Sequence, residues 1–414
     1  MSDVADLQQL LPELLLLAAV VVIITRRFHL PDTSALALAG VLFGSFANIH
    51  PEISRDLILL AFLPPLLFEG ALNIEFGEFV RRWKQIALLA VPGTLVAAGT
   101  IALGLNVLAG FSWPHAALVG IMLAPTDPVS VLATMKEHGV SGGLRALLEG
   151  ESIFNDAAAI VLFSLALTWA FPENHHREGF LATSTELVGE VGIGVVVGLV
   201  IGFAVHRLMA TVSDHLIEIT LSIVCSYGAY VAADRLGGSG VMAVVFSGLL
   251  LSNYGVQMSM STASRQRLAD FWEVIAFLVN SAAFVLIGLA FEISSLRDAG
   301  LVKAVVIIAV AVLVGRVIVV SGMLVPFARW VENKPLPGPW GPAIFWGGLR
   351  GTIPIALVLG LALNERELGG IQAVPLVFSV VLLSLLGQGL TYGPLLRKLG
   401  LSATEPPDPS RAEG

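Results

Sequence analysis

Charged residues are scarce in this chain. Asp, Glu, Lys and Arg make up 13% of its 414 residues and hydrophobic residues 56%, whereas about a quarter of a soluble domain is charged. Apolar runs of about twenty residues recur along the chain, and each is long enough to cross a hydrocarbon core of roughly 30 Å as a helix. This composition excludes a soluble domain and predicts a polytopic membrane protein in contact with the lipid bilayer.

Other absences narrow the class further. Apolar and polar residues do not alternate over strand-length segments, which argues against a membrane β-barrel. The single cysteine, Cys225, lies in an apolar stretch, so we expect a packing residue and no disulfide framework. The net charge of -8 comes without a basic patch, which argues against nucleic acid as a partner. The first residues are acidic where a signal peptide is basic, so the first apolar run is expected to remain as a span.

Hydropathy, together with the positions of Pro, Gly and charged clusters, predicts an all-α fold with about 13 transmembrane helices. We expect one transmembrane domain over residues 1–400 and a short disordered cytoplasmic tail over 401–414, because the residues after Leu401 are polar and contain Pro. The thirteen spans are expected at residues 9–25, 33–50, 55–73, 85–109, 114–136, 146–171, 185–206, 214–233, 239–252, 270–291, 301–327, 340–363 and 372–396.

The distribution of basic residues predicts the orientation. If the N-terminus lies outside, fifteen of the 23 Lys and Arg residues fall in inward-facing segments and six in outward-facing ones. Cytoplasmic loops carry the excess of basic residues in membrane proteins. We therefore expect an external N-terminus, a cytoplasmic C-terminus and a location in the cell inner membrane.

Two predicted spans are interrupted in a similar way, by Ala-Pro-Thr-Asp-Pro at residues 124–128 and by Gly-Thr-Ile-Pro at 351–354. Proline removes a helical hydrogen bond, and the freed carbonyl groups are tolerated only inside protein or beside a hydrated cavity. Paired interruptions in the two halves of a chain are typical of transporters with inverted repeats, two discontinuous helices and a site near the membrane midplane. Two ordinary proline kinks are the alternative.

Few charges lie within the predicted spans, and each costs roughly 2.5 to 3.5 kcal/mol on insertion scales. They are therefore expected either to function or to be paired. The candidates are Glu69, Asp127, Glu151, Asp156, Arg316 and Arg350, with Glu273 less central in its span.

The segment 150–156 is the densest polar cluster in a span. A helix advances about 100° per residue, so Ser152 and Asp156 share one stripe while Glu151 and Asn155 share another. Glu151 could then neutralise an intramembrane arginine, for which Arg316 is the preferred partner.

The other stripe predicts a cation site. Asp156 and Ser152 can offer hard oxygen ligands to a dehydrated alkali cation, and Thr126, Asp127 and the freed carbonyl groups can complete the cage. Burial favours the neutral form of a carboxyl group, so Asp156 can bind a proton near neutral pH and release it when a cation arrives. Because Asn155 is neutral, a single acid would carry either one proton or one cation, which predicts electroneutral one-for-one exchange.

For several charged residues the sequence leaves two possible roles open. Arg350 could pair with an acid or compensate a helix end, and Asp127 could cap the second half of its broken helix as well as serve the site. Glu69 could contact the site through water or could be a satisfied packing residue. The Glu151 and Arg316 pair could be purely structural.

Three segments together carry a family resemblance: residues 124–129 (APTDPV), 149–156 (EGESIFND) and 346–351 (WGGLRG). In their order and spacing they resemble the monovalent cation/proton antiporter family, in its NhaP-like branch related to animal sodium/proton exchangers. The resemblance implies a homodimer in which a core bundle moves against a dimerisation domain, with the broken helices crossed around the site.

The same resemblance implies roles for individual residues. It makes Asp156 the carrier of cation and proton, with Thr126, Asp127 and Ser152 as ligands directly or through water, and places Asn155 beside the site. It also implies a structural Glu151 to Arg316 ion pair and places Glu69 near the access path. The long cytoplasmic tail of the animal exchangers has no counterpart here, which puts their style of regulation in doubt.

The sequence thus predicts a secondary antiporter without a cofactor rather than an enzyme, with Na+ held by Asp156, Ser152 and Thr126. Potassium or lithium, in place of sodium or alongside it, is an alternative substrate. A cation channel is another possibility, since carboxylates and carbonyl groups also build selectivity filters. An intramembrane hydrolase is disfavoured because Ser152 lacks an intramembrane His or Lys to activate it. The adjacent His175 and His176 are expected in a solvated loop rather than a metal site.

Overall fold

The computed structural model describes residues 2–28, 32–47, 61–140, 142–173, 179–256, 260–289, 291, 294, 297–332 and 334–402. The predicted all-α fold is confirmed. The strands within these residues are β1 (Glu367–Leu368) and β2 (Ile371–Gln372), which form one antiparallel hairpin. Its turn is Gly369 and Gly370, with φ of 62° and 79°, values that glycine adopts without steric cost.

The helices follow the predicted spans along the chain. They are α1 (Ser2–Phe28), α2 (Asp32–Ala47), α3 (Leu63–Asn73), α4 (Phe76–Leu88), η2 (Leu89–Gly93), α5 (Thr94–Gly104), η3 (Leu105–Ala109), α6 (Trp113–Leu123), α7 (Val129–Glu137), α8 (Gly143–Ala170), α9 (Gly179–Met209), α10 (His215–Arg235), α11 (Gly240–Leu250), η4 (Leu251–Val256), α13 (Thr262–Leu289), α14 (Ala299–Val317), η6 (Ile318–Leu324), η7 (Phe327–Val331), α15 (Trp340–Trp346), α16 (Thr352–Leu359), η8 (Leu363–Glu365), α17 (Ala373–Ser384), η9 (Leu385–Gly389) and α18 (Leu390–Lys398).

Every one of the thirteen predicted spans coincides with one or more of these helices. Among the described residues, seven helices are long and apolar enough to cross a membrane alone, and shorter apolar helices or pairs of helices occupy the other predicted spans. Residues 55–60 of the third predicted span, the pair His175 and His176, and residues 403–414 of the predicted tail lie outside the described residues.

The fourth span begins earlier than hydropathy predicts. The helix starts at Phe76 instead of residue 85, because α4 is amphipathic and includes Arg81, Arg82 and Lys84. Helical hydrogen bonds continue past the end of an apolar segment, whereas hydropathy detects only its apolar part. Pro92 then lies in the π-helical turn η2 within an otherwise continuous helix, which is a common way to accommodate a missing amide.

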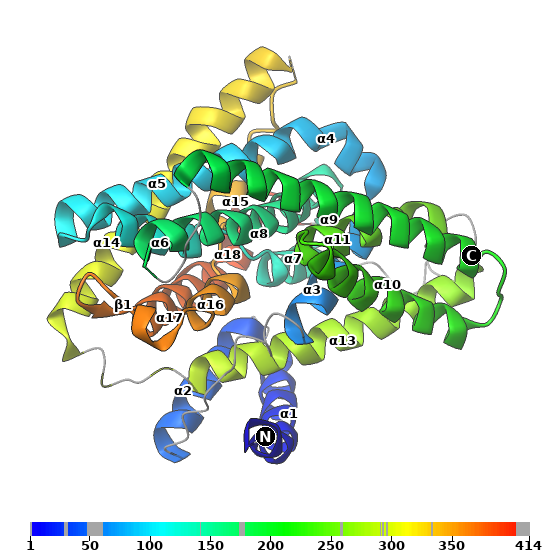
Figure 1. Ribbon diagram of the computed structural model, residues 1–414, viewed down its shortest axis with the longest axis horizontal. Coiled ribbons are helices and arrows are strands. Elements are labelled where there is room, and N and C mark those ends of the chain that lie inside the picture. Colours follow the sequence, from blue (N-terminus) through cyan, green and yellow to red (C-terminus); the bar gives the residue numbers. More distant parts are fainter. Residues whose placement is uncertain are drawn as a thin grey trace.

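The helices pack into two groups. Helices α4–α8 and α14–α18 contact one another extensively and form what we call the site bundle; α1–α3, α9–α11 and α13 form the flanking bundle. Contacts between the bundles are sparser; they join α2 to α17 and η9, α3, α9 and α11 to α8, and α13 to α16. Figure 1 shows α1, α2 and α13 along the lower edge and α5, α6 and α14 on the left.

Close glycine contacts hold the flanking bundle together. Gly194, Gly198 and Gly202 recur every four residues on α9, and a Cβ atom at any of them would crowd the backbone of α11 or of Ser239, the residue just before it. Small residues at this spacing let two membrane helices approach closely, which strengthens their van der Waals packing. Cys225, on α10, is a buried free cysteine, as its apolar surroundings in the sequence predict.

Candidate functional site

Two discontinuous helices meet at the centre of the site bundle. Helices α6 and α7 are separated by the non-helical residues 124–128, and α15 and α16 by residues 347–351. The two breaks contact each other directly, because the amide of Asp127 donates to the carbonyl of Leu349 over 2.8 Å. The crossed arrangement of two broken helices is therefore present in this chain.

Asp127 lies where two helices begin. Its Oδ1 accepts a hydrogen bond from the amide of Val129, at the start of α7, over 2.9 Å. The amide of Thr352, at the start of α16, interacts with the same carboxylate. A helix N-terminus carries about half a positive charge. The two N-termini therefore both favour a negative charge at Asp127.

Arg350 lies at the C-terminal end of a helix, α6. Its side chain is 1% exposed, and Nη1 donates to the carbonyl groups of Ala124 and, over 3.0 Å, Pro125. These carbonyl groups follow the last turn of α6, where the helix dipole is negative. Of the two interpretations of Arg350, the structure supports the helix C-terminus, and among the described residues no ion pair of Arg350 with an acid is present.

Glu151 and Arg316 form a buried two-point ion pair. Arg316 Nη1 contacts Glu151 Oε1, and Nη2 donates to Oε2 over 3.0 Å. The same Nη2 also donates to the carbonyl of Ile344, in the last turn of α15, over 2.9 Å. Arg316 therefore joins α8 and α14 to the first half of the second broken helix.

The other stripe of α8 faces the first break. The Ser152 hydroxyl is hydrogen-bonded to the Asp156 carboxylate, and Asp127 is near enough to act on that carboxylate electrostatically. Asn155 Nδ2 donates to Thr126 Oγ1 over 2.8 Å. The structure thus brings together Asp156, Ser152, Asn155, Thr126 and Asp127, from two elements about thirty residues apart in the sequence.

Glu69 lies at the boundary of the two bundles. It belongs to α3 and accepts a hydrogen bond from Asn73 Nδ2, one turn further along. The charged groups that act on its carboxylate are Glu149, Glu273 and Arg145. Glu69 therefore belongs to a second group of charges, apart from those around Asp156. The access path past Glu69 remains a prediction.

Two residues of this region escape the sequence reasoning. Thr352 contributes its backbone amide, which no side-chain pattern reveals. Glu149 is 5% exposed, and its Oε1 is held by Arg145 Nε at 2.8 Å. The sequence position of Glu149 could have identified it, because a residue seven before Asp156 lies on nearly the same face of the helix, two turns away.

Asp156 differs from every other charge of the site. Glu151 is balanced by Arg316, Arg350 by the end of α6, and Asp127 by the starts of α7 and α16. No basic side chain pairs with Asp156 within the part of the chain that the structure describes. Among the charged residues of the site that the structure describes, Asp156 is therefore the one for which no compensating group is seen.

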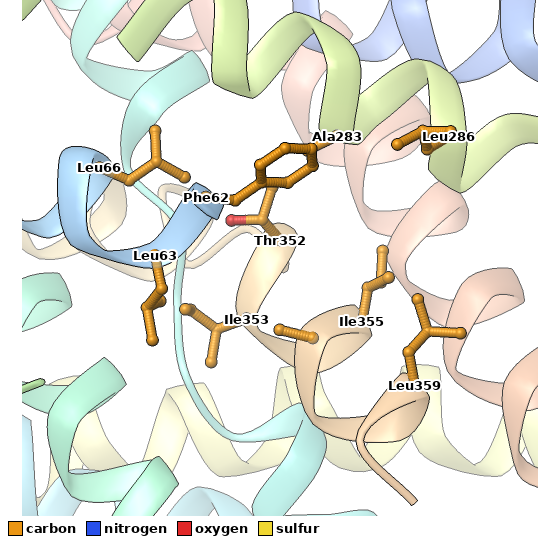
Figure 2. Close-up of a pocket in the computed structure, with 10 residues that line it drawn as sticks. Phe62, Leu63, Leu66, Ala283, Leu286, Thr352, Ile353, Ile355 and Leu359 are labelled. Atoms are coloured by element: carbon orange, nitrogen blue, oxygen red, sulfur yellow. The ribbon is translucent and has the colours of Figure 1, made fainter. Parts of the chain in front are cut away.

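An apolar pocket adjoins the site at the bundle boundary. Figure 2 shows Phe62 and Leu63, from the start of α3, opposite Ile353 and Ile355 of α16. Thr352 is the polar residue that lines it. The start of α16, which contacts Asp127, therefore also lies at the surface where the two bundles meet.

The composition of the site bears on which metal ions could bind. Among the described residues, no group of three or more His, Cys, Asp and Glu side chains could hold a metal ion. Such clusters are typical of sites for zinc and other transition metals. The oxygen donors around Asp156 are the hydroxyl groups of Ser152 and Thr126 and the carboxylate of Asp127, which suit a hard cation.

Comparison with known proteins gives matches over nearly the whole chain. The sequence model of the family described as sodium/hydrogen exchanger, transmembrane, matches residues 15–398. The Na(+)/H(+) antiporter ApNhaP of Aphanothece halophytica is 39% identical over 376 residues, which are 90% of this chain and 70% of that protein. The Na(+)/H(+) antiporter NhaH of Halobacillus dabanensis is 32% identical over 403 residues, or 94% of this chain and 98% of that protein.

A solved structure shares the fold. The sodium proton antiporter MjNhaP1 of Methanocaldococcus jannaschii superposes with a TM-score of 0.76 at 22% sequence identity, covering 96% of this chain and 99% of that one. This likeness supports the polytopic architecture with its two broken helices.

Proposed function

The chain belongs to the sodium/hydrogen exchanger family, and we propose that it exchanges Na+ for H+ across the membrane, one for one, through Asp156. The family is one of membrane transporters, not of enzymes. The observation that carries the proposal is that Asp156 has no basic partner among the described residues, whereas the other charges of the site are compensated.

Competition for one carboxylate explains the exchange. A deprotonated Asp156 in a poorly hydrated bundle is costly, and either a proton or a monovalent cation removes that cost. A loaded site then carries the same net charge in both cases. Because Asn155 is neutral and Asp127 is compensated by two helix N-termini, one acid changes its occupancy per cycle, and transport is electroneutral.

The proposed sodium ligands come from both sides of the site. Asp156 and Ser152 supply oxygens from α8, and Thr126 supplies a hydroxyl from the first break. Asp127 attracts the ion electrostatically or contacts it through water. Li+ is expected to compete with Na+, because these oxygen donors suit both ions, and K+ is the alternative that ion size would decide.

The transport movement would follow the bundle boundary. Contacts within each bundle are extensive and those between the bundles are sparser, so the site bundle could shift as a unit and expose Asp156 to either side in turn. We propose that the flanking bundle also forms a homodimer and stays in place. Location in the cell inner membrane, an external N-terminus and a role in pH homeostasis belong to the same proposal.

The experiment measures sodium-driven proton movement in proteoliposomes that contain a trapped pH dye. Wild type is compared with Asp156→Asn and with Asp298→Asn, which makes the same chemical change at the exposed start of α14, where Asp298 caps the amide of Gly300. Asparagine caps a helix about as well as aspartate, so Asp298→Asn should exchange normally and Asp156→Asn should not. Normal exchange by Asp156→Asn would refute the proposal.

A voltage clamp tests the stoichiometry. With potassium and valinomycin setting the membrane potential, an electroneutral exchanger gives the same rate at each imposed voltage. A rate that changes steeply with voltage would mean that net charge moves in each cycle, and one-for-one exchange would be wrong. Repeating the series with Li+ and K+ identifies the transported cations.

A further inference from the structure

A small pocket with polar and apolar lining residues lies beside the proposed cation site, at the ion pair of Glu151 and Arg316. It is lined by α8, by the breaks of both discontinuous helices and by the fourth and eleventh spans. Its lining residues are Leu89, Gly93, Thr94, Ala97, Ala124, Thr126, Glu151, Asn155, Arg316, Val319 and Arg350. Asp156 is not one of them, whereas Thr126, a proposed sodium ligand, is, so the cavity adjoins the proposed cation position.

Two polar atoms at this cavity lack hydrogen-bond partners. Asn155, 2% exposed, uses Nδ2 for Thr126, and its Oδ1 has no partner among the described residues. Arg350, 1% exposed, uses Nη1 for the end of α6, and its Nε has no partner there either. Buried polar atoms are nearly always hydrogen-bonded, to protein or to ordered water. One orphan is a donor and the other an acceptor, and both residues line this cavity, so a group that both accepts and donates, such as water, has the chemistry to serve both.

We propose that one permanently bound water molecule occupies this cavity and bridges Arg350 Nε and Asn155 Oδ1. Thr94 offers it a third partner, because the Thr94 hydroxyl donates to the carbonyl of Ala90 over 2.7 Å and keeps its lone pairs free to accept. A buried water typically makes about three hydrogen bonds. The space for a water-sized particle, about 10 Å³, is close to the least that holds one molecule.

The charge around the cavity favours a neutral occupant over an ion. Arg316 and Arg350 contribute two positive charges, and Glu151 contributes one negative charge. The ends of α6 and α15, which the two arginines cap, contribute about half a negative charge each. These contributions sum to about zero, so neither an anion nor a cation gains from entering.

The water would determine how Asn155 faces the site. With Oδ1 bound to water, Nδ2 points to Thr126, so Thr126 Oγ1 receives one hydrogen bond from Asn155. The remaining lone pair of Thr126 is then the one available to a cation. The water thereby joins α8 to the crossing of the broken helices and positions a proposed ligand without touching the ion.

X-ray radiolytic footprinting tests the proposal without a transport assay, so its failure is separate from a failure of the proposed function. Radiolysis of bound water oxidises the side chains that touch it. Leu89 and Val319 line the cavity and are 1% and 2% exposed, and Ile101 and Leu324, both 0% exposed, are buried controls that do not line it. We expect Leu89 and Val319 to be oxidised several-fold faster than the controls in detergent-solubilised wild type.

Equal background oxidation of all four residues would overturn the proposal. A structure at a resolution that shows water gives the second test, with a density peak expected within hydrogen-bond distance of both Arg350 Nε and Asn155 Oδ1. Crystals grown in bromide distinguish an anion from water. An anomalous peak in the cavity would show that the occupant is an ion, and the assignment to water would be wrong.

Discussion

The backbone amide of Asp127 donates to the carbonyl of Leu349, so the two broken helices are hydrogen-bonded to each other where both leave the helical path. Each break would otherwise present unpaired backbone groups in a membrane interior, at a cost of several kcal/mol per group. The crossing also brings Gly351 against Asp127, because a Cβ atom at residue 351 would overlap the Asp127 carboxylate. The contact therefore depends on a residue without a side chain.

Gly351→Ala should abolish transport and lower the thermal stability of the protein. The added methyl group must push either Asp127 or the crossing apart, and overpacking of this kind costs about 1–3 kcal/mol. Gly99→Ala is the matched control, because a Cβ atom there meets nothing within 4 Å and alanine favours a helix. Exchange rates in proteoliposomes and unfolding temperatures in detergent check both variants. Full activity of Gly351→Ala would show that the crossing has room for a methyl group at residue 351.

Asp127→Asn separates the charge of this residue from its capping bond. The amide oxygen can still accept from Val129, but the negative charge that faces two helix N-termini is lost, which should cost about 1–2 kcal/mol. We also expect the Na+ concentration for half-maximal exchange to rise several-fold. Asp214→Asn makes the same change at the start of α10, where Oδ1 accepts from the amide of Leu216 over 2.8 Å, and should be nearly silent.

Chemical unfolding in mixed micelles and a sodium titration of exchange give the two measurements. If Asp127→Asn and Asp214→Asn behave alike in both, the charge of Asp127 has no special role, and its compensation by α7 and α16 is irrelevant to transport.

Removal of one partner from the Glu151 and Arg316 pair should be more damaging than removal of both. Glu151→Gln leaves a buried guanidinium group without its carboxylate, which should cost about 3–5 kcal/mol. Glu151→Gln with Arg316→Met removes both charges, although the carbonyl of Ile344 then loses its donor. A double-mutant cycle on unfolding free energy measures the coupling. A coupling near zero would contradict the two-point ion pair.

Tyr227→Phe should destabilise the protein by about 1 kcal/mol, because it removes a hydrogen bond to a carbonyl group far from the cation site. Residue 65 is a proline, so it has no amide to donate to the carbonyl of Ala61, and the Tyr227 hydroxyl donates to that carbonyl instead, over 3.3 Å. Pro65→Ala restores an amide at the position that helical hydrogen bonding requires. In that background, Tyr227→Phe should cost measurably less, and an undiminished cost would rule out this explanation.

The sequence predicts the break in the first discontinuous helix and the polar stripes of α8 better than it predicts the surroundings of the buried charges. Pro125 and Pro128 are local, so a break near residues 124–128 follows from the covalent chemistry of proline. The stripes of α8 follow in the same way from the 100° step of a helix, which separates Ser152 and Asp156 from Glu151 and Asn155. The preferred partner of Glu151, Arg316, is also the one that the structure shows.

The environments of Arg350 and Glu69 could not be predicted from sequence. Arg350 binds carbonyl groups that lie 225 and 226 residues away, and Glu69 is surrounded by Glu149, Glu273 and Arg145. A sequence shows that an intramembrane charge needs compensation. A helix end, however, compensates a charge through its backbone groups, and no particular residue type marks it in the sequence. Only the packing of α6 against α16 reveals which end is close enough.

The sequence by itself determined that this chain is a bundle of apolar helices with two proline-containing breaks and very few intramembrane charges, because these properties depend on composition, local backbone chemistry and the period of a helix. The tertiary structure alone decided which charges are compensated. It places Asp127 at two helix starts and Arg316 and Arg350 at two helix ends. Electrostatic compensation depends on distances between segments far apart in the chain, and among the site charges that the structure describes, those distances leave Asp156 without a basic partner, which is why we propose it as the ion carrier.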